Sequence, residues 1–356
     1  MVEAVNIHKY GYTILQIETM SVCNMMCRFC AYPDRTDKGK TLSERMVYDI
    51  IDSLEIDNAF EYVCFSHFNE PLMDNRIYSF IGYAKKRHNP VLLVTNGLLF
   101  RSKDVIDRLI EASPDRIKIS LQVLDADLYK GSRGISSSFD EYKRGIIEFV
   151  NSAGGCSSKI VIDLACNFLS APSIMKSRLL GLEHGDPSIY DSINDLKDKM
   201  KLFLMELQSS GGRFRFDPEA FDRHIEKVCK DYSSQDEYRL DTNISMKVKP
   251  FLYGKRLADF YPLKKGARCS NRILGILASG SVVPCCLAYG DILSMGNVND
   301  SSLAKILNDS TGLLSRIRQG ENSPATCRRC LGAPTKRGVF LKDIRNAAMD
   351  SVGWNS

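Results

Sequence analysis

The sequence of 356 residues contains no apolar run long enough to cross a membrane. Its N-terminus lacks the basic and then apolar pattern of a secretory signal peptide, and the chain has no internal repeat or low-complexity tract. Twelve cysteines without a secretory signal favour a reducing cytoplasm and metal ligation over disulfide bonds. The net charge of +5 is mild for this length, and a short basic run such as Lys85–Arg87 is typical of a solvated helix end. We therefore expect a globular cytoplasmic protein that binds neither nucleic acid nor a membrane.

Three cysteines near the N-terminus are spaced as C-x3-C-x2-C, namely Cys23, Cys27 and Cys30. This spacing indicates metal ligation, but the next cysteine is Cys64 and the nearest histidines are His8 and His67. A structural zinc site needs four protein ligands, which makes zinc the weaker alternative. A four-iron cluster held by three thiolates instead keeps one iron free for a substrate or a cofactor. Ordinary core cysteines are a third alternative, which three cysteines in eight residues disfavour.

Short apolar segments alternate with amphipathic ones along the first half of the chain. The expected strands are Thr13–Glu18, Phe60–Phe65, Val91–Val94, Arg116–Leu121 and Lys159–Cys166, with a sixth near Ile244–Leu252. The expected helices begin at a Thr41-x-x-Glu44 capping box, then cover Ile77–Ala84, Val105–Ile110 and Phe139–Val150. This alternation predicts an α/β fold with a parallel sheet, and its spacing fits a partial (β/α)6 barrel of the TIM type. The loop with three cysteines follows the first strand, at the end where such barrels gather their reactive groups.

The regular alternation fails after about Ser170. We interpret residues 171–243 as an insertion with helical pieces at Ile193–Gln208 and Phe221–Lys230. Such an insertion serves as a lid or substrate-binding element, or it is a surface elaboration without a catalytic part. The expected organisation is an N-terminal tail at 1–11, the barrel at 12–262, a small β-hairpin and helix domain at 263–335 and a C-terminal tail at 336–356.

Five more cysteines occur in the last quarter of the chain, namely Cys269, Cys285, Cys286, Cys327 and Cys330. Two apolar runs divided by Ala278–Ser281 predict a β-hairpin, followed by a turn at Gly296-Asn297 and a helix near Leu303–Leu307. A C-x2-C pair with two distant cysteines indicates a four-thiolate site. The spacing does not separate a [4Fe–4S] cluster from zinc.

The first cysteine triplet, with aromatic Phe29 before its last cysteine, resembles that of the radical S-adenosylmethionine (SAM) superfamily. In that superfamily the open iron of a [4Fe–4S] cluster chelates SAM. An electron from the cluster then cleaves SAM and leaves a 5′-deoxyadenosyl radical that abstracts a substrate hydrogen. The resemblance also implies a flavodoxin- or ferredoxin-type reductant.

The C-terminal cysteines resemble those of the twitch domain, the shorter relative of the SPASM domain. This resemblance implies one auxiliary [4Fe–4S] cluster held by Cys269, Cys285, Cys327 and Cys330. The family spacing from Gly280 favours Cys285 over Cys286 as the ligand.

The resemblance further implies a set of SAM contacts, namely Phe29, Tyr32, Glu70, Thr95, Asn96, Ser120, Gln122 and Arg133. Glu70 is the acid that matches the position holding the SAM amino group, although the usual glycines beside it are absent, and a loop cap is its alternative role. Thr95 and Asn96 end the strand that contacts the ribose, and Arg133 matches an arginine that pairs with the SAM carboxylate. Ser120 and Gln122 occupy alternate positions of one strand, which predicts a shared face. The aromatic residues Phe29 and Tyr32 are placed to flank the adenine.

The reaction type stays open at this stage. A four-thiolate auxiliary cluster has no vacant iron, so it would transfer an electron, as an oxidation requires. An epimerisation instead needs a hydrogen donor, for which Cys166 and then Cys64 are the candidates, with buried core thiols as the alternative. No N-terminal extension is long enough for a domain that binds a peptide leader, which favours a small substrate over a peptide. We expect oxidation or epimerisation at a carbinol carbon of a sugar, an aminocyclitol or a similar natural-product precursor. A peptide maturase acting at Cα or Cβ, and a metal-binding or electron-transfer protein without catalysis, are the alternatives.

Overall fold

The computed structural model defines the conformation of most of the chain. The described residues are 3–135, 137–166, 189–190, 192–211, 216–230, 236–250, 260–264, 268–290, 292–320, 322–333 and 335–351. The first part of the expected insertion (171–188) and the end of the sixth expected strand (251–252) lie outside these residues. No helix in the described ranges is long and apolar enough to span a membrane.

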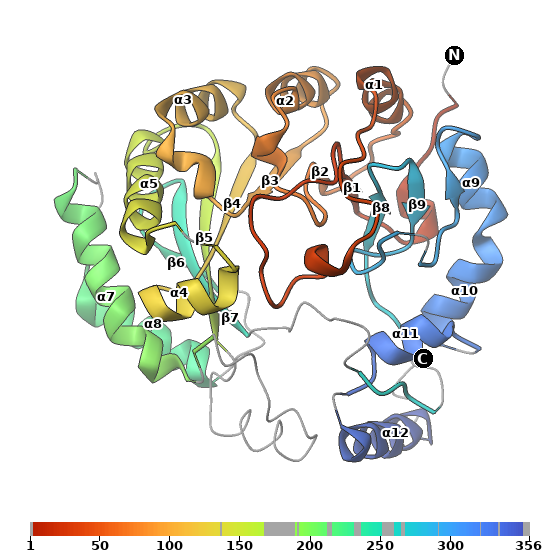
Figure 1. Ribbon diagram of the computed structural model, residues 1–356. Helices are drawn as coiled ribbons and strands as arrows, with labels where there is room; N and C mark the ends of the chain where they lie inside the picture. Colours follow the sequence, from red (N-terminus) through yellow and green to blue (C-terminus); the bar gives the residue numbers. More distant parts are fainter. Residues whose placement is uncertain are drawn as a thin grey trace.

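One sheet of ten strands organises the fold, in the order β10-β9-β8-β1-β2-β3-β4-β5-β7-β6. The strands are β1 Ile14–Ile17, β2 Tyr62–Cys64, β3 Val91–Thr95, β4 Arg116–Gln122, β5 Lys159–Cys166, β6 Tyr238–Arg239, β7 Ile244–Pro250, β8 Ile273–Ile276, β9 Ser281–Val283 and β10 Gly296–Asn297. Strands β1, β2, β3, β4, β5 and β7 pair in parallel, in this order. Figure 1 shows that they curve into an open arc, which confirms the expected partial α/β barrel.

The α-helices of the described residues are α1 Glu44–Asp52, α2 Ile77–Lys86, α3 Lys103–Ala112, α4 Ala126–Arg133, α5 Phe139–Ser152, α7 Ile193–Ser209, α8 Pro218–Lys230, α9 Leu303–Asp309, α10 Thr311–Gln319, α11 Ala325–Cys330 and α12 Lys336–Ser351. Short 3-10 helices lie at η1 Ile7–Tyr10, η2 Tyr32–Asp34, η3 Pro71–Met73 and η4 Leu98–Arg101. In Figure 1 helices α1, α2, α3 and α5 line the outside of the arc, and the loop after β1 crosses its concave side.

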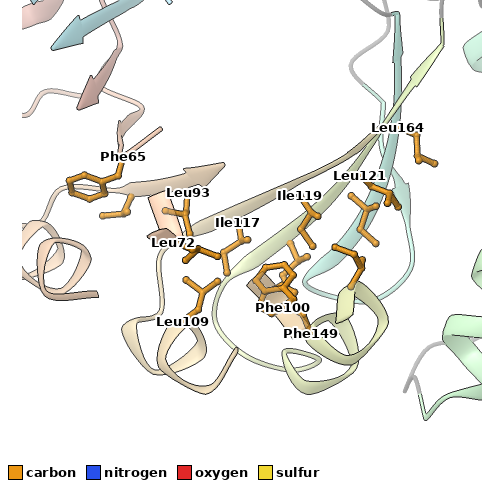
Figure 2. Close-up of a cluster of buried hydrophobic side chains, with 14 of the residues drawn as sticks. Phe65, Leu72, Leu93, Phe100, Leu109, Ile117, Ile119, Leu121, Phe149 and Leu164 are labelled. Atoms are coloured by element: carbon orange, nitrogen blue, oxygen red, sulfur yellow. The ribbon is translucent and has the colours of Figure 1, made fainter. Parts of the chain in front are cut away.

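The main core lies between the strands and these outer helices. Ile117 and Ile119 of β4 are fully buried and point towards side chains of α3 and α5 in Figure 2. The rings of Phe100 and Phe149 stack there with their centroids 4.1 Å apart. Each such side chain stabilises the fold by about 1.5–3 kcal/mol through its burial. Because strand side chains alternate, the other face of β4 points into the barrel, and it carries half-buried polar residues.

Two local expectations are wrong. Helix α1 begins at Glu44 with Ser43 as its N-cap, since Ser43 Oγ accepts a hydrogen bond from the Met46 backbone nitrogen at 3.2 Å. Thr41, the expected cap, is held apart from the helix by an antiparallel bridge to Met20. Gly296-Asn297 does not form a turn, because it pairs with β9 as the short strand β10. A Cβ at Gly296 would lie 3.1 Å from Ile306 Cγ1, so glycine allows the strand to approach α9.

The expected C-terminal hairpin is confirmed, and it extends the barrel sheet. Strands β8 and β9 pair antiparallel, while β8 also pairs in parallel with β1, with Ile14 opposite Ile273. The hairpin therefore joins the sheet next to the strand that carries the first cysteine loop. Residues 336–351, expected within a tail, form α12.

Candidate cofactor and active site

The loop with the three cysteines docks on the end of α4. The backbone nitrogens of Met26 and Arg28 donate to the carbonyl oxygens of Arg133 and Ser132, at 3.1 and 2.9 Å. These are carbonyls that a helix end leaves without an internal partner. Gly134 follows with a φ of 58°, and a Cβ there would lie 2.6 Å from the Met26 carbonyl oxygen. Only glycine fits this close approach, so the end of α4 fixes the loop conformation.

The thiols of this loop suit metal ligation. Burial raises the pKa of Cys23 to about 12 and that of Cys30 to about 11, while the Cys27 sulfur lies 3.5 Å from Arg133 Nη1. Buried thiolates need nearby positive charge, which a metal centre supplies. In the part of the chain that the structure describes, no three His, Cys, Asp or Glu side chains converge enough to share one metal ion. A cluster binds each thiolate at a different iron, so it fits more widely spaced thiols than zinc does.

Glu70 forms a polar centre beside this loop. Its carboxylate accepts hydrogen bonds from Thr95 Oγ1 and from the Asn96 backbone nitrogen, both at 2.7 Å. It also accepts from the Leu72 backbone nitrogen at 3.2 Å and so caps η3, which is the alternative role considered above. Burial raises the pKa of Glu70 to about 7, against the three donors that favour its ionised form. Glu70, Thr95 and Asn96 are therefore brought together, as a site for a cationic amino group requires.

Asn96 connects this centre to the cysteine loop. Its side-chain amide donates to Asn24 Oδ1 at 2.8 Å and lies 3.8 Å from the Cys23 sulfur. The backbone oxygen of Asn96 accepts from the hydroxyl of Tyr142, which is buried, at 2.7 Å. Nothing in the sequence marks Tyr142 or Asn24 as functional. Tyr142 has the spacing of an ordinary core residue of a helix, and Asn24 is one of the intervening residues of the cysteine motif.

Arg133 is a buried guanidinium whose described contacts are not carboxylates. Its Nη2 donates to the Leu121 carbonyl oxygen at 3.0 Å and contacts that of Ser120, and its Nη1 faces Cys27. Its Nε is buried without a hydrogen-bond partner, and Phe29 lies with its ring centroid 5.6 Å from the guanidinium carbon. A buried cation is costly unless an anion neutralises it. The site therefore fits a cluster on Cys27 together with a ligand carboxylate.

The end of β4 departs from regular strand geometry. A register shift occurs between Ile119 and Gln122, and Gln122 has a φ of 69°. The Val123 nitrogen donates across it to the Leu121 oxygen at 2.8 Å, which forms a strained γ-turn. This turn interrupts the alternation from which a shared face for Ser120 and Gln122 was expected. Gln122 Oε1 is buried without a hydrogen-bond partner, so it remains available to a ligand.

Phe29 and Tyr32 lie on opposite sides of Cys30 in the sequence. Phe29 is half-buried beside Arg133, whereas Tyr32 is buried and its backbone nitrogen lies 3.4 Å from the Cys30 sulfur as a donor. The ammonium of Lys38 lies 5.0 Å from the centroid of the Tyr32 ring. Both aromatic residues thus border the cysteine loop.

The two candidate hydrogen donors face different sides of the sheet. Cys64 lies opposite Gln16 of β1, on the inward face, and its sulfur lies 3.7 Å from the Ser66 carbonyl oxygen. Cys166 lies two and four residues after Leu164 and Ile162, so it shares with them the face of β5 that packs against the core. Cys166 was the first candidate for the hydrogen donor on sequence grounds. The alternation of strand side chains instead favours Cys64, because its thiol faces the barrel interior.

Four of the five C-terminal cysteines line one pocket, namely Cys269, Cys285, Cys327 and Cys330. The remaining lining is largely apolar, with Pro284, Leu287 and Ile317 among it. Cys286 lies instead with its sulfur 3.7 Å from Asn271 Oδ1. Four thiols in one apolar pocket fit an auxiliary cluster, and the pocket includes Cys285 where either neighbour had been possible.

A histidine with both ring nitrogens buried lies in the loop of Glu70 and packs against the C-terminal hairpin. The ring centroid of His67 is 4.6 Å from that of Phe68, which is 5.5 Å from that of Tyr289. A Cβ at Gly275 would lie 3.0 Å from His67 Nε2, so the ring rests on strand β8. Burial lowers the pKa of His67 to about 3, which keeps the imidazole neutral. From the sequence, His67 was only a histidine too distant to complete a zinc site. Its packing joins the loop of Glu70 to the C-terminal hairpin.

Comparison with known proteins identifies two domains in the chain. The model of the radical SAM superfamily matches residues 17–164, and that of SPASM, an iron-sulfur cluster-binding domain, matches residues 268–331. The chain therefore contains a radical SAM domain and, C-terminal to it, a SPASM domain. A radical SAM domain together with a SPASM domain implies SAM and [4Fe–4S] clusters as cofactors.

Two curated relatives are similar in sequence, one over part of this chain and the other over most of it. The AdoMet-dependent heme synthase of Oleidesulfovibrio alaskensis is 29% identical over 139 residues, which are 38% of this chain and 34% of that protein. This chain thus spans about a third of the length of that relative. A probable GTP 3′,8-cyclase of Methanocella arvoryzae is 23% identical over 314 residues, covering 86% of this chain and 92% of that protein.

Two solved structures share the fold at low identity. Native anSMEcpe with bound AdoMet is 14% identical, with 94% of this chain and 95% of that chain covered and a TM-score of 0.51. Streptococcus suis SuiB is 15% identical, with 88% and 70% covered and a TM-score of 0.51. These likenesses concern the fold.

Proposed function

We propose that this radical SAM enzyme oxidises or epimerises a carbinol carbon of a small polar substrate, such as a sugar or an aminocyclitol. When bound, SAM and its reduced cluster supply the radical that removes a substrate hydrogen. The observation that carries the proposal is the polar inward face of the barrel, where Cys64 and Gln16 lie beside each other. A reaction at a carbinol needs polar groups that bind hydroxyls next to a radical source.

In this proposal, different residues of the site bind different parts of SAM. Glu70 accepts hydrogen bonds from the SAM amino group, and Thr95 Oγ1 and the Asn96 nitrogen keep its carboxylate oriented. Arg133 pairs with the SAM carboxylate through the Nε that has no partner in the protein. Thr95 and Asn96 border the ribose, Ser120 and Gln122 contact SAM from the end of β4, and Phe29 and Tyr32 border the adenine. The ligands of the first cluster are Cys23, Cys27 and Cys30, and those of the auxiliary cluster are Cys269, Cys285, Cys327 and Cys330.

Cys64 is the hydrogen donor that an epimerisation would use. A thiol gives up a hydrogen atom only in its protonated form, and burial raises the pKa of Cys64 to about 11. The thiol therefore stays protonated at neutral pH. Cys166 carries the same chemistry but lies on the face turned towards the core.

Turnover in deuterium oxide tests this proposal with a panel of polyols and amino sugars. Because a thiol exchanges with solvent, epimerisation through Cys64 places deuterium on the product carbon, and Cys64→Ala removes that label while Cys166→Ala retains it. Oxidation gives a ketone without a new carbon–deuterium bond and is independent of Cys64. If the enzyme turned over peptides and none of the compounds in the panel, the proposal of a small substrate would be contradicted. The name of the Methanocella relative refers to a nucleotide, which supports a small molecule.

A further inference from the structure

A charged group lies on the inward face of β4, β5 and β7. We propose that Lys118, Asp163 and Lys249 form a subsite that binds an anionic oxygen group of the substrate, either a carboxylate or a phosphate. The inference rests on the proposed function, since it places the substrate in the same barrel. Lys249 Nζ lies 2.8 Å and Lys118 Nζ 3.1 Å from Asp163 Oδ2.

Strand register places these side chains on one face. Asp163 of β5 lies opposite Lys247 of β7, and Lys249 is two residues further along the same strand. Lys118 of β4 lies opposite Val161, which is two residues before Asp163. The side chain of Asp163 is fully buried, whereas Lys118 and Lys249 are each 30% exposed. The carboxylate is thus buried, whereas both lysine side chains remain partly exposed.

The group has an excess of positive charge. One oxygen of Asp163 serves both ammonium groups, and its other oxygen, Oδ1, is buried without a hydrogen-bond partner. Burial lowers the pKa of the neighbouring Lys247, and the charge of Lys118 acts in the same direction. The nearby acid Glu237 is already bonded to Arg116 at 2.6 Å and also lies near Lys159.

This excess distinguishes a binding site from a structural ion pair. A buried pair adds little to stability even when its charges balance, and here two ammonium groups share one carboxylate. Burial lowers the pKa of Lys249 despite the nearness of Asp163, and the charges of Lys118 and Arg133 act in the same direction. An anion bound by the lysines would neutralise the surplus charge.

The position of Lys249 connects the subsite to the cofactor site. Lys249 lies opposite Ala165, near the ends of β5 and β7 where the barrel is expected to hold its reactive groups. The charge of Arg133, whose Nη1 faces Cys27, reaches Lys249. An anion held by Lys249 would therefore anchor the substrate on the side of the barrel that faces the cysteine loop.

Anion titrations of the reconstituted protein with SAM bound, kept anaerobic, test this subsite. Pyrophosphate serves as the phosphate probe and malonate as the carboxylate probe, and binding is measured by calorimetry. Lys249→Met and Lys118→Met should each weaken binding about tenfold or more, the effect of losing one charge-assisted hydrogen bond. Asp163→Asn should strengthen binding, because the ammonium groups lose their competing anion. Lys103→Met, on the exposed face of α3 beside Asp107, is the matched control and should bind as the wild type does.

The direction of the Asp163→Asn effect separates binding from a purely structural role. A structural group predicts no gain in anion affinity for this variant, and that result overturns the inference, as does equal binding by all the variants or no binding of either probe. Preference for one probe identifies the phosphate or carboxylate and supports the inference. Lys249→Gln, which keeps a polar side chain, replaces Lys249→Met should the latter unfold. Cleavage of SAM by the wild type is measured separately and tests the proposed function alone.

Discussion

The guanidinium of Arg133 lies 3.5 Å from the sulfur of Cys27, inside the protein. In the proposed site, Arg133 contacts the cluster loop and also pairs with the SAM carboxylate. We expect Arg133→Lys to weaken SAM binding about tenfold or more, because an ammonium cannot supply the same fork of donors. Calorimetry of the anaerobic, reconstituted protein measures this effect. Arg316→Lys, at an exposed position of α10, is the matched control, and equal losses in both variants would rule out a specific role for Arg133.

Glu70 gives SAM binding a defined pH dependence. Burial raises the pKa of Glu70 from 4.5 to about 7, so the folded protein without SAM retains a proton that the unfolded chain loses. The stability due to Glu70 is therefore fully present below about pH 4.5 and is lost as the pH rises to about 7. Since a SAM ammonium prefers the ionised carboxylate, SAM affinity should rise as the pH passes through about 7.

Glu70→Gln removes the titrating group but keeps a similar shape. We expect this variant to bind SAM more weakly at high pH, and its affinity should lack the rise seen in the wild type. The measurement is the dissociation constant of SAM across this pH range. An unchanged rise in the variant would assign the titration to another group.

Gly134 lets the cysteine loop contact the end of α4. Gly134→Ala places a Cβ about 2.6 Å from the Met26 carbonyl oxygen at a φ of 58°, which the loop can relieve only by moving. We expect iron binding at the first site to fall while the auxiliary site keeps its iron. Gly82→Ala is the control, because Gly82 lies within α2 and a Cβ there meets nothing within 4 Å. Full iron content in Gly134→Ala would mean that the loop tolerates displacement.

The auxiliary pocket distinguishes adjacent cysteines. Cys285 lines it with three other cysteines, while Cys286 lies beside Asn271. We therefore expect Cys285→Ser to lose about four irons per chain and Cys286→Ser to lose none. Iron analysis and electron paramagnetic resonance of the two variants give the comparison. Iron loss only in Cys286→Ser would reverse this assignment of the ligand.

Much of the barrel could be predicted from local patterns. Strand β5 and helix α5 begin where apolar periodicity placed them, since buried strands and amphipathic helices leave a direct trace in the sequence. Helix α4 could not be predicted this way. It is short and ends in Gly-Ser-Arg-Gly, which suggests a loop, yet docking of the cysteine loop stabilises its last turn.

Only part of the site could be predicted from the sequence. Glu70, Thr95 and Asn96 converge because they follow neighbouring parallel strands, which the alternation already implied. The choice between Cys64 and Cys166 depends on which side of each strand faces the barrel, and that requires the register of the sheet. Asp163 and its lysines went unnoticed, because charges on three separate strands form no motif until the strands pair.

The formation of 5′-deoxyadenosine from SAM tests the central claim most directly. The reconstituted wild-type protein, reduced under anaerobic conditions, should release this product, and Cys30→Ala should release none while retaining the spectrum of its auxiliary cluster. Cys229→Ala, on α8, is the matched control and should cleave SAM as the wild type does. Wild-type protein that holds its iron and binds SAM without releasing 5′-deoxyadenosine, or a Cys30→Ala variant that cleaves SAM normally, would contradict the account.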